Sequence, residues 1–325
     1  MNTWTSNLRI QPRLSRRSMG RFKTSWEKEA SDMCGSLYKL DSERVFAVKR
    51  YQPREPLSER LSEYDFGQHE YPKDQLPEHV ERKFHNQFEK ESTAEYYVSF
   101  GLSHPNLVET LDLMRDATGQ LCLVMEFCNL LEFVVRDKPN GSYLVREEAD
   151  CFFMQIMRGF KYLHGMGITH GDVKLDNVLV TEKGCAKLTD FGRASRHRRM
   201  KFGKLPPTKV DYPQMQPPQL FNDKNESFDS RTMDVWSAGM LYYLLRRGNF
   251  MWAKAHKSDE NYALFLEQRK RKDFIDFNLL GNANCAEAFY SIFEPIADKR
   301  ITAEQFLETP WAREVHVCEA GTRGL

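Results

Sequence analysis

Strand-type segments fill the first part of this chain, and helical spacing fills the last part. Short apolar runs bounded by polar turns are typical of β-strands, whereas apolar residues spaced by three or four are typical of helices. The spacing is helical from Thr232 to Glu314. The expected strands lie at residues 36–40, 45–50, 107–114 and 121–127. Strands first and helices later predict an α+β fold with two lobes, the first mostly β and the second mostly α.

A long amphipathic segment and a hairpin follow the expected strands. A broad apolar stripe from Phe152 to Leu163 predicts a long helix. A strand-turn-strand unit is expected at residues 177–180 and 186–189. Earlier in the chain, four residues share one face of an expected helix: Phe84, Phe88, Glu95 and Ser99.

Composition narrows the class of protein. The 325 residues carry a net charge of +1. A dedicated nucleic-acid binder normally keeps a clear basic excess, so the net charge argues against that class of protein. Hydrophobic residues make up 41% of the chain, enough for a sizeable core, and no apolar stretch approaches the roughly 20 residues that span a bilayer. The seven cysteines are odd in number and include no CxxC pair, so reduced thiols are favoured over a disulfide framework or a zinc site.

The first 26 residues contain six basic side chains and no acidic ones. They predict a solvated basic tail, and an organelle transit peptide is the alternative. We expect a cytoplasmic protein.

Three polar clusters suggest chemistry. Lys49 ends the apolar run Phe46-Ala47-Val48, a polar segment covers residues 170–177, and Asp190-Phe191-Gly192 follows the expected hairpin. Because Asn177 opens that hairpin and Asp190 ends it, both side chains return to the same edge. An amide oxygen beside a carboxylate suits Mg²⁺, which prefers oxygen ligands and keeps positions for water and phosphate. In the same segment, Asp172 is placed to accept a proton from an attacking hydroxyl and Lys174 to neutralise phosphoryl charge.

With these clusters in this order, the chain resembles a eukaryotic protein kinase from about Ala30 to Trp311. The resemblance implies the two-lobed kinase fold, ATP and Mg²⁺ as cofactors, and a protein substrate with a Ser or Thr acceptor. It also implies roles for individual residues: Lys49 on the phosphates, Asp172 as the catalytic aspartate, Lys174 as the lysine typical of Ser/Thr kinases, and Asn177 and Asp190 as metal ligands.

Further positions follow from the same resemblance. Glu95 is expected to pair with Lys49, and Glu89 and Glu91 remain alternatives. The resemblance also assigns the backbone of Glu126 and Cys128 to adenine, Gly35 to the phosphate loop, Asp234 to support of the catalytic loop, and Arg300 to the end of the activation segment.

A narrower resemblance is to the fungal halotolerance and nitrogen-permease-reactivator kinases. It rests on Pro105–Leu111, on the long insertion after Lys49, on Met251–Ala255 with Ser258–Tyr262, and on the end of the chain at Trp311 and Val315–Cys318. It implies support of nutrient and ion transporters.

The chain departs from the kinase pattern at four places. The glycine-rich loop reads Ala30-Ser31-Asp32-Met33-Cys34-Gly35, and Gly171 stands where kinases have arginine. The end of the activation segment reads Pro217-Pro218-Gln219, so Gln219 is expected to hydrogen-bond Arg300 without a charged pair. Tyr212 stands where a threonine is usual.

Two functions therefore compete. The first is an active Ser/Thr kinase, and the alternative is a pseudokinase that acts as a scaffold or allosteric regulator. The expected organisation is a basic tail (residues 1–25), an N-lobe with the hinge (26–128) that includes a surface insertion (51–80), a C-lobe (129–317) and a C-terminal tail (318–325). The sequence predicts no oligomeric state.

Overall fold

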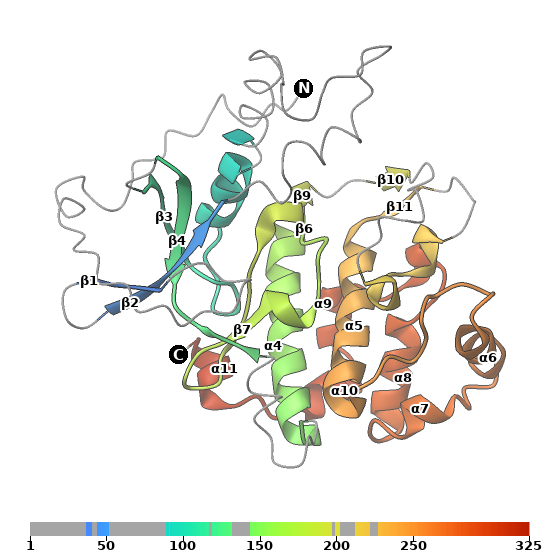
Figure 1. Cartoon of the computed structure of the whole chain (residues 1–325). Coiled ribbons are helices and arrows are strands. Elements are labelled where there is room, and N and C mark those ends of the chain that lie inside the picture. Colours follow the sequence, from blue (N-terminus) through green and yellow to red (C-terminus); the bar gives the residue numbers. More distant parts are fainter. Residues whose placement is uncertain are drawn as a thin grey trace, which may run out of the picture. The chain divides into compact units, whose positions relative to one another are not determined.

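A computed structural model describes residues 37–40, 44–51, 89–90, 92–116, 119–131, 144–196, 199–201, 212–221 and 227–324 (Figure 1). The basic tail, the segment Ala30–Gly35 and most of the insertion at 51–80 lie outside these residues. The chain divides into two compact units. The first holds Met1–Gly101 and Glu109–Phe127, and the second holds Leu102–Val108 and Cys128–Leu325.

The first unit contains a four-stranded antiparallel sheet in the order β1-β2-β4-β3. Its strands are β1 (Leu37–Leu40), β2 (Arg44–Arg50), β3 (Thr110–Arg115) and β4 (Leu121–Glu126). Val48 faces Val124 across the β2–β4 pair, and together with Cys122 they form the buried cluster of this sheet. Because side chains alternate along a strand, Lys49 lies on the opposite face from Val48.

One predicted strand was too long. Residues 107–109 were expected in the strand 107–114, but β3 begins at Thr110. Leu107 instead forms an isolated parallel bridge with Leu188, and the Val108 N–H donates to the Leu188 carbonyl at 2.9 Å. Both side chains are 2% exposed. Their apolar character reflects burial in the second unit rather than a place in the sheet.

The second unit is mainly helical. Its longest helices, α4 (Arg146–Gly165) and α5 (Arg231–Arg247), pack side by side (Figure 1). Aromatic rings fill the core around them: the Phe153 ring centroid lies 5.0 Å from that of Tyr242 and 5.2 Å from that of Phe306. The other helices are α6 (Glu260–Gln268), α7 (Ile275–Asn278), α8 (Ala283–Ile292), α9 (Ala303–Leu307), α10 (Pro310–Glu314) and α11 (Glu319–Arg323).

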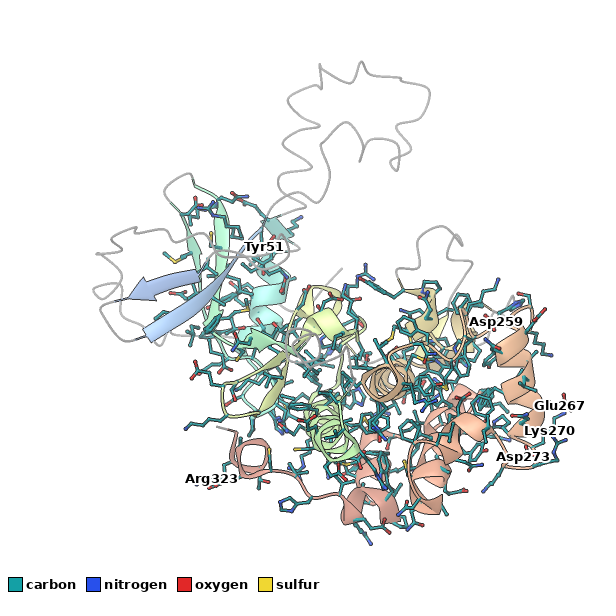
Figure 2. The ribbon with its side chains drawn as sticks, turned by 60° about the horizontal axis from the view of Figure 1, so that its bottom comes forward. Tyr51, Asp259, Glu267, Lys270, Asp273 and Arg323 are labelled. Atoms are coloured by element: carbon teal, nitrogen blue, oxygen red, sulfur yellow. The ribbon has the colours of Figure 1, made fainter. Side chains whose placement is uncertain are left out.

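Helix α6 shows how these helices divide their faces. Tyr262 and Phe265 are buried and pack against Trp252. Glu267 is exposed, as is Lys270, which follows the end of the helix by two residues. Both lie at the outer edge of this unit (Figure 2). Asp259 caps the helix, because its carboxylate accepts from the Tyr262 N–H at 3.1 Å. Among the described residues, no helix combines the length and the apolar character needed to cross a membrane.

Small sheets position the polar loops of the second unit. β5 (Asn129–Leu130), β7 (Val178–Val180) and β8 (Ala186–Leu188) form one antiparallel sheet. β6 (Ile168–Thr169) pairs with β9 (Ser195–Arg196), and β10 (Arg199–Lys201) pairs with β11 (Ser227–Asp229). The polar segment 170–177 therefore connects β6 to β7, and Asp190 lies between β8 and β9.

Candidate active site

The hairpin β7–β8 brings Asn177 close to the segment that contains Asp190. Val178 pairs with Leu188, and beyond this pair the Thr189 N–H donates to the Asn177 carbonyl at 3.1 Å. Asp190 is the next residue in the chain. The two predicted metal ligands thus follow the same end of one hairpin.

Asp172 lies at the centre of a polar group in the loop between β6 and β7. The Asn177 side-chain amide donates to the Asp172 carboxylate at 3.0 Å and to its backbone carbonyl at 2.7 Å. The Lys174 ammonium lies 3.4 Å from Oδ2 of the same carboxylate, and the Arg193 guanidinium lies 3.6 Å from Oδ1. Asp172 is buried, so its carboxylate has a fixed orientation and two cations beside it.

His170 supports this loop. Its Nδ1 accepts from the Asp172 N–H at 3.3 Å, so the ring proton is on Nε2, which donates to the Thr189 carbonyl at 2.9 Å. The ring also packs against Phe191, with centroids 5.3 Å apart. One imidazole therefore ties the loop that carries Asp172 to the residues on either side of Asp190.

Asp234, on α5, holds the backbone of the same loop. Its carboxylate accepts from the N–H groups of His170 and Gly171, each at 2.9 Å. It also contacts Nε2 of His164 at 2.9 Å. Asp234 is 1% exposed, and a buried carboxylate is stable only when its oxygens are paired in this way.

The structure explains why residue 171 is glycine. Its φ is +78°, a left-handed conformation that side chains disfavour. A Cβ at this position would also lie 3.0 Å from the Arg193 carbonyl oxygen. An arginine, like any residue with a Cβ, would be strained in this backbone conformation.

Asp190 also has a left-handed backbone, with φ 60° and ψ 77°. Aspartate tolerates this region better than most residues, and such conformations concentrate at functional sites. The Asp190 carboxylate accepts from the Gly192 N–H at 3.3 Å and caps the short helix Phe191–Arg193. Among the described residues, no group of three or more His, Cys, Asp or Glu side chains gathers in one place. The two predicted ligands, Asn177 and Asp190, would supply two oxygen atoms, which fits an ion that keeps water and phosphate as its other ligands.

In the first unit, Lys49 contacts Glu95. The Lys49 ammonium lies 2.9 Å from one carboxylate oxygen and 3.2 Å from the other. Glu95 lies on the buried face of helical residues 92–100, which it shares with Ser92 and Ser99, and its side chain is 5% exposed. Glu89, one of the two alternatives, instead pairs with Arg115 at 2.6 Å. Glu91 lies outside the described residues.

The backbone of Glu126 is part of the end of β4. Its N–H donates to the Glu109 carbonyl at 3.0 Å, and its side chain accepts from the Glu109 N–H at 2.7 Å. Cys128 is buried and is the first residue of the segment Cys128–Leu325, which belongs to the second unit. Gly35 lies outside the described residues.

Arg300 and Gln219 contact each other as expected. The Arg300 guanidinium donates to the Gln219 side-chain oxygen at 3.0 Å and to the Thr232 carbonyl at 2.8 Å, and it stacks 4.7 Å from the centroid of the Trp236 ring. Burial lowers the pKa of Arg300 to about 9, so the group stays charged at neutral pH. The uncharged Gln219 thus keeps a hydrogen bond to Arg300 at the position where kinases usually have a charged glutamate.

Sequence reasoning missed two contacts at this site. The sequence pattern assigned no contact to Arg193, yet its guanidinium lies beside the Asp172 carboxylate. Tyr212 was noted only as a departure, yet its ring centroid lies 5.2 Å from the Lys174 ammonium. Residues 193 and 212 lie outside the segment 170–177, so no spacing within that segment indicated either contact.

Comparison with known proteins agrees with this geometry. A family model described as the protein kinase domain matches residues 77–312. The serine/threonine-protein kinase hal4 of Schizosaccharomyces pombe is 38% identical over 241 residues, which cover 73% of this chain and 38% of that protein. The serine/threonine-protein kinase HAL4/SAT4 of Saccharomyces cerevisiae is 32% identical over 324 residues, which cover 96% of this chain and 47% of that protein.

A third relative is a probable serine/threonine-protein kinase, HAL5-like, of Vanderwaltozyma polyspora. It is 30% identical over 259 residues, which cover 71% of this chain and 33% of that protein. The chain thus spans less than half the length of these relatives. The kinase model covers most of the chain, and the loop geometry around Asp172, Asn177 and Asp190 is consistent with that match. The chain therefore belongs to the protein kinase domain family.

Proposed function

We propose that this chain is an ATP-dependent protein kinase that transfers a phosphoryl group to a Ser or Thr hydroxyl of a protein. The observation that carries the proposal is the state of Asp172: the Asn177 amide, at 3.0 Å, orients its buried carboxylate. A carboxylate held in one orientation is what a hydroxyl acceptor requires, because the proton-accepting atom must lie in hydrogen-bond reach of that hydroxyl.

The cations beside Asp172 have a complementary role. Lys174, 3.4 Å from Oδ2, would balance negative charge on the phosphoryl group as it leaves ATP. The same ammonium restrains the carboxylate in the absence of substrate. Asp172 would then accept the hydroxyl proton.

Asn177 and Asp190 would hold Mg²⁺. The Asn177 nitrogen already donates to Asp172, which leaves the amide oxygen as the atom suited to a cation. When bound, Mg²⁺ neutralises phosphate charge and helps to align the transferred group.

Lys49 would bind the ATP phosphates, with Glu95 holding its ammonium in place. The adenine would bind to backbone groups at Glu126 and Cys128. Because the Glu126 N–H already donates to Glu109, the Glu126 carbonyl is the group suited to the adenine amine. Gly35 would contact the phosphates through its backbone amide.

The finer organisation is also proposed. We assign the β-rich first unit to a kinase N-lobe and the helical second unit to a C-lobe. The resemblance to halotolerance kinases supports regulation of nutrient or ion transporters as the process served, and a cytoplasmic location is consistent with that role.

The test compares wild type with Asp172→Asn, using ATP labelled on the γ-phosphate, Mg²⁺, and generic acidic and basic protein substrates. We expect the variant to lose about 10²- to 10⁴-fold in transfer rate, because the proton acceptor is gone. Asp176→Asn, the same change four residues later in the loop, serves as the control and should stay near the wild-type rate.

Absence of transfer by wild type, or an unchanged rate in Asp172→Asn, would contradict the proposal and favour the pseudokinase alternative. A shift of the melting temperature with Mg²⁺ and ATP separates loss of binding from loss of transfer.

A further inference from the structure

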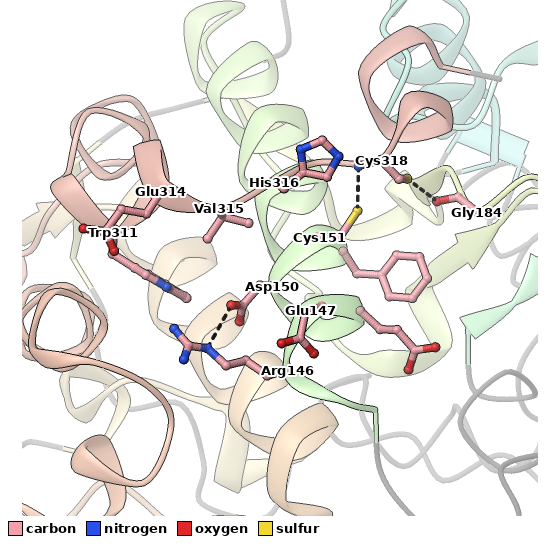
Figure 3. Close-up of a pocket in the computed structure, with 12 residues that line it drawn as sticks. Arg146, Glu147, Asp150, Cys151, Gly184, Trp311, Glu314, Val315, His316 and Cys318 are labelled. Carbon is pink, nitrogen blue, oxygen red and sulfur yellow. Dashed lines mark hydrogen bonds and ion pairs between the residues drawn. The ribbon is translucent and has the colours of Figure 1, made fainter.

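Two cysteines that are 167 residues apart in sequence meet at the C-terminal end of the second unit (Figure 3). Cys151 lies on α4, and Cys318 is the residue that caps α11. The Cys318 backbone N–H donates to the Cys151 sulfur at 3.3 Å. Both are free thiols.

The two sulfurs share a donor. The Gln155 side-chain amide lies 3.3 Å from the Cys151 sulfur and 4.0 Å from the Cys318 sulfur. Burial raises the pKa of the Cys151 thiol, and the Cys318 backbone N–H, which donates to the Cys151 sulfur, opposes the rise. The sulfurs therefore face the same small space.

A groove gives access to this pair. It has a volume of about 560 Å³, and both cysteines line it together with Phe152, Gly184 and Val315 (Figure 3). Cys151 is buried, whereas Cys318 is partly exposed. A small oxidant entering the groove thus reaches Cys318 more readily than Cys151.

The backbone around Cys318 is held close to α4. A Cβ at Gly321 would lie 2.4 Å from the Gln155 side chain, and one at Gly324 would lie 2.6 Å from Pro105. Glycine allows this close packing at both positions. Cys318 is thus kept next to Cys151 by its neighbours and is not free to move away as a loose tail would.

We propose that Cys151 and Cys318 are a modification site that forms a reversible disulfide with a peroxide as oxidant. The Cys318 thiolate attacks a peroxide oxygen, the O–O bond breaks, and the departing hydroxide is protonated to water, leaving a sulfenic acid. The Cys151 thiolate then attacks the Cys318 sulfur, the S–O bond breaks, and a second water leaves. Two electrons from the two sulfurs reduce one hydrogen peroxide to two waters.

The disulfide would join α11 to α4 close to Gln155, a residue that contacts the β7–β8 hairpin. The Gln155 side-chain oxygen accepts from the Ala186 N–H of β8 at 2.7 Å and from the Asn106 amide at 3.3 Å. Gln155 thus contacts both the cysteine pair and the strand that leads to Asp190. The site is independent of phosphoryl transfer, so the proposal stands or falls separately from the proposed function.

The experiment exposes the purified chain to hydrogen peroxide, alkylates the remaining thiols and maps the peptides by mass spectrometry. We expect a peptide pair that joins residues 151 and 318, loss of two alkylation sites, and reversal by dithiothreitol. The oxidised protein should also melt at a higher temperature, because the cross-link closes a long loop.

Cys318→Ser removes the site and keeps the cap, since a serine hydroxyl still accepts from the Gly321 N–H. This variant should show neither the linked peptide nor the melting shift, whereas Cys285→Ala, at a buried cysteine elsewhere, should keep both. Full alkylation of Cys151 and Cys318 in treated wild type, or cross-links only between separate chains or with other cysteines, would overturn the proposal.

Discussion

The Lys174 ammonium lies 5.2 Å from the centroid of the Tyr212 ring while it contacts the Asp172 carboxylate at 3.4 Å. The ring therefore takes part in placing the lysine of the proposed site. Tyr212 has φ 52°, a left-handed backbone conformation that is uncommon outside glycine.

This contact predicts a graded response to substitution at Tyr212. An exposed cation–π contact contributes about 0.5–1 kcal/mol, so Tyr212→Leu should lower kcat about two- to fivefold. Tyr212→Phe keeps the ring and should stay near wild type. The measurement is kcat and KM for ATP and for a protein substrate. Equal losses in both variants would assign the effect to the hydroxyl or to the fold instead of the ring.

Gly171 and Gly165 form a matched pair for testing backbone strain. Gly171→Ala should destabilise the protein by about 1–2 kcal/mol, because its φ is +78° and a Cβ would lie 3.0 Å from the Arg193 carbonyl. Gly165→Ala, at the end of α4 with no atom within 4 Å of a new Cβ, should be neutral or stabilising by up to about 1 kcal/mol. Urea unfolding measures both, and similar values for the two variants would contradict the strain.

Asp234 should be essential for stability as well as for activity. Asp234→Ala leaves the buried N–H groups of His170 and Gly171 without an acceptor, at a cost of about 2–4 kcal/mol in unfolding free energy. Asp234→Asn keeps one oxygen and should cost less. Denaturant unfolding followed by tryptophan fluorescence checks the order. An alanine variant as stable as the asparagine variant would show that these bonds contribute little.

Asp150 predicts a dependence of stability on pH. Burial raises the pKa of its carboxyl, although hydrogen bonding from the Tyr242 hydroxyl and the charge of Arg146 oppose the rise. The folded state then binds this proton more tightly than the unfolded state does. The contribution of Asp150 therefore falls as pH rises from 3.8, the ordinary value, through the raised pKa of the folded state.

Asp150→Asn removes that titration and retains an oxygen acceptor for Tyr242. The stability of the variant relative to wild type should rise with pH across this window and level off above it. Unfolding free energies at several pH values measure the difference. A difference that stays constant with pH would show that Asp150 titrates alike in both states.

The sequence predicted the hairpin β7–β8 well, and the reason is local. Its two strands are short apolar runs on either side of a glycine turn, and the predicted bounds 177–180 and 186–189 differ from the observed ones by one residue at two of four ends. The polar residues at its ends could therefore be placed together from the amino-acid pattern alone. The partner of Lys49 was also predicted from local spacing, because Glu95 was expected on the same helical face as Phe84, Phe88 and Ser99. Glu95 and Ser99 are buried in the structure, and the two phenylalanines lie outside the described residues.

Contacts between distant segments were beyond such reasoning. Leu107 and Val108 look like strand residues because burial, not pairing in the sheet, selects apolar side chains there. The residues after 317 were expected to be a tail, yet they contain α11, a helix of five residues that carries no long apolar stripe. The position of α11 depends on close packing at Gly321 and Gly324, and such packing leaves no periodic pattern of apolar residues in the sequence.

That packing has a practical consequence for anyone who handles the protein. The backbone at Gly324 approaches Pro105 so closely that even one methyl group would collide with it. A purification tag or fluorescent fusion joined at Leu325 would begin one residue beyond this contact. Such a fusion therefore needs a flexible spacer that keeps its bulk away from the contact between Gly324 and Pro105.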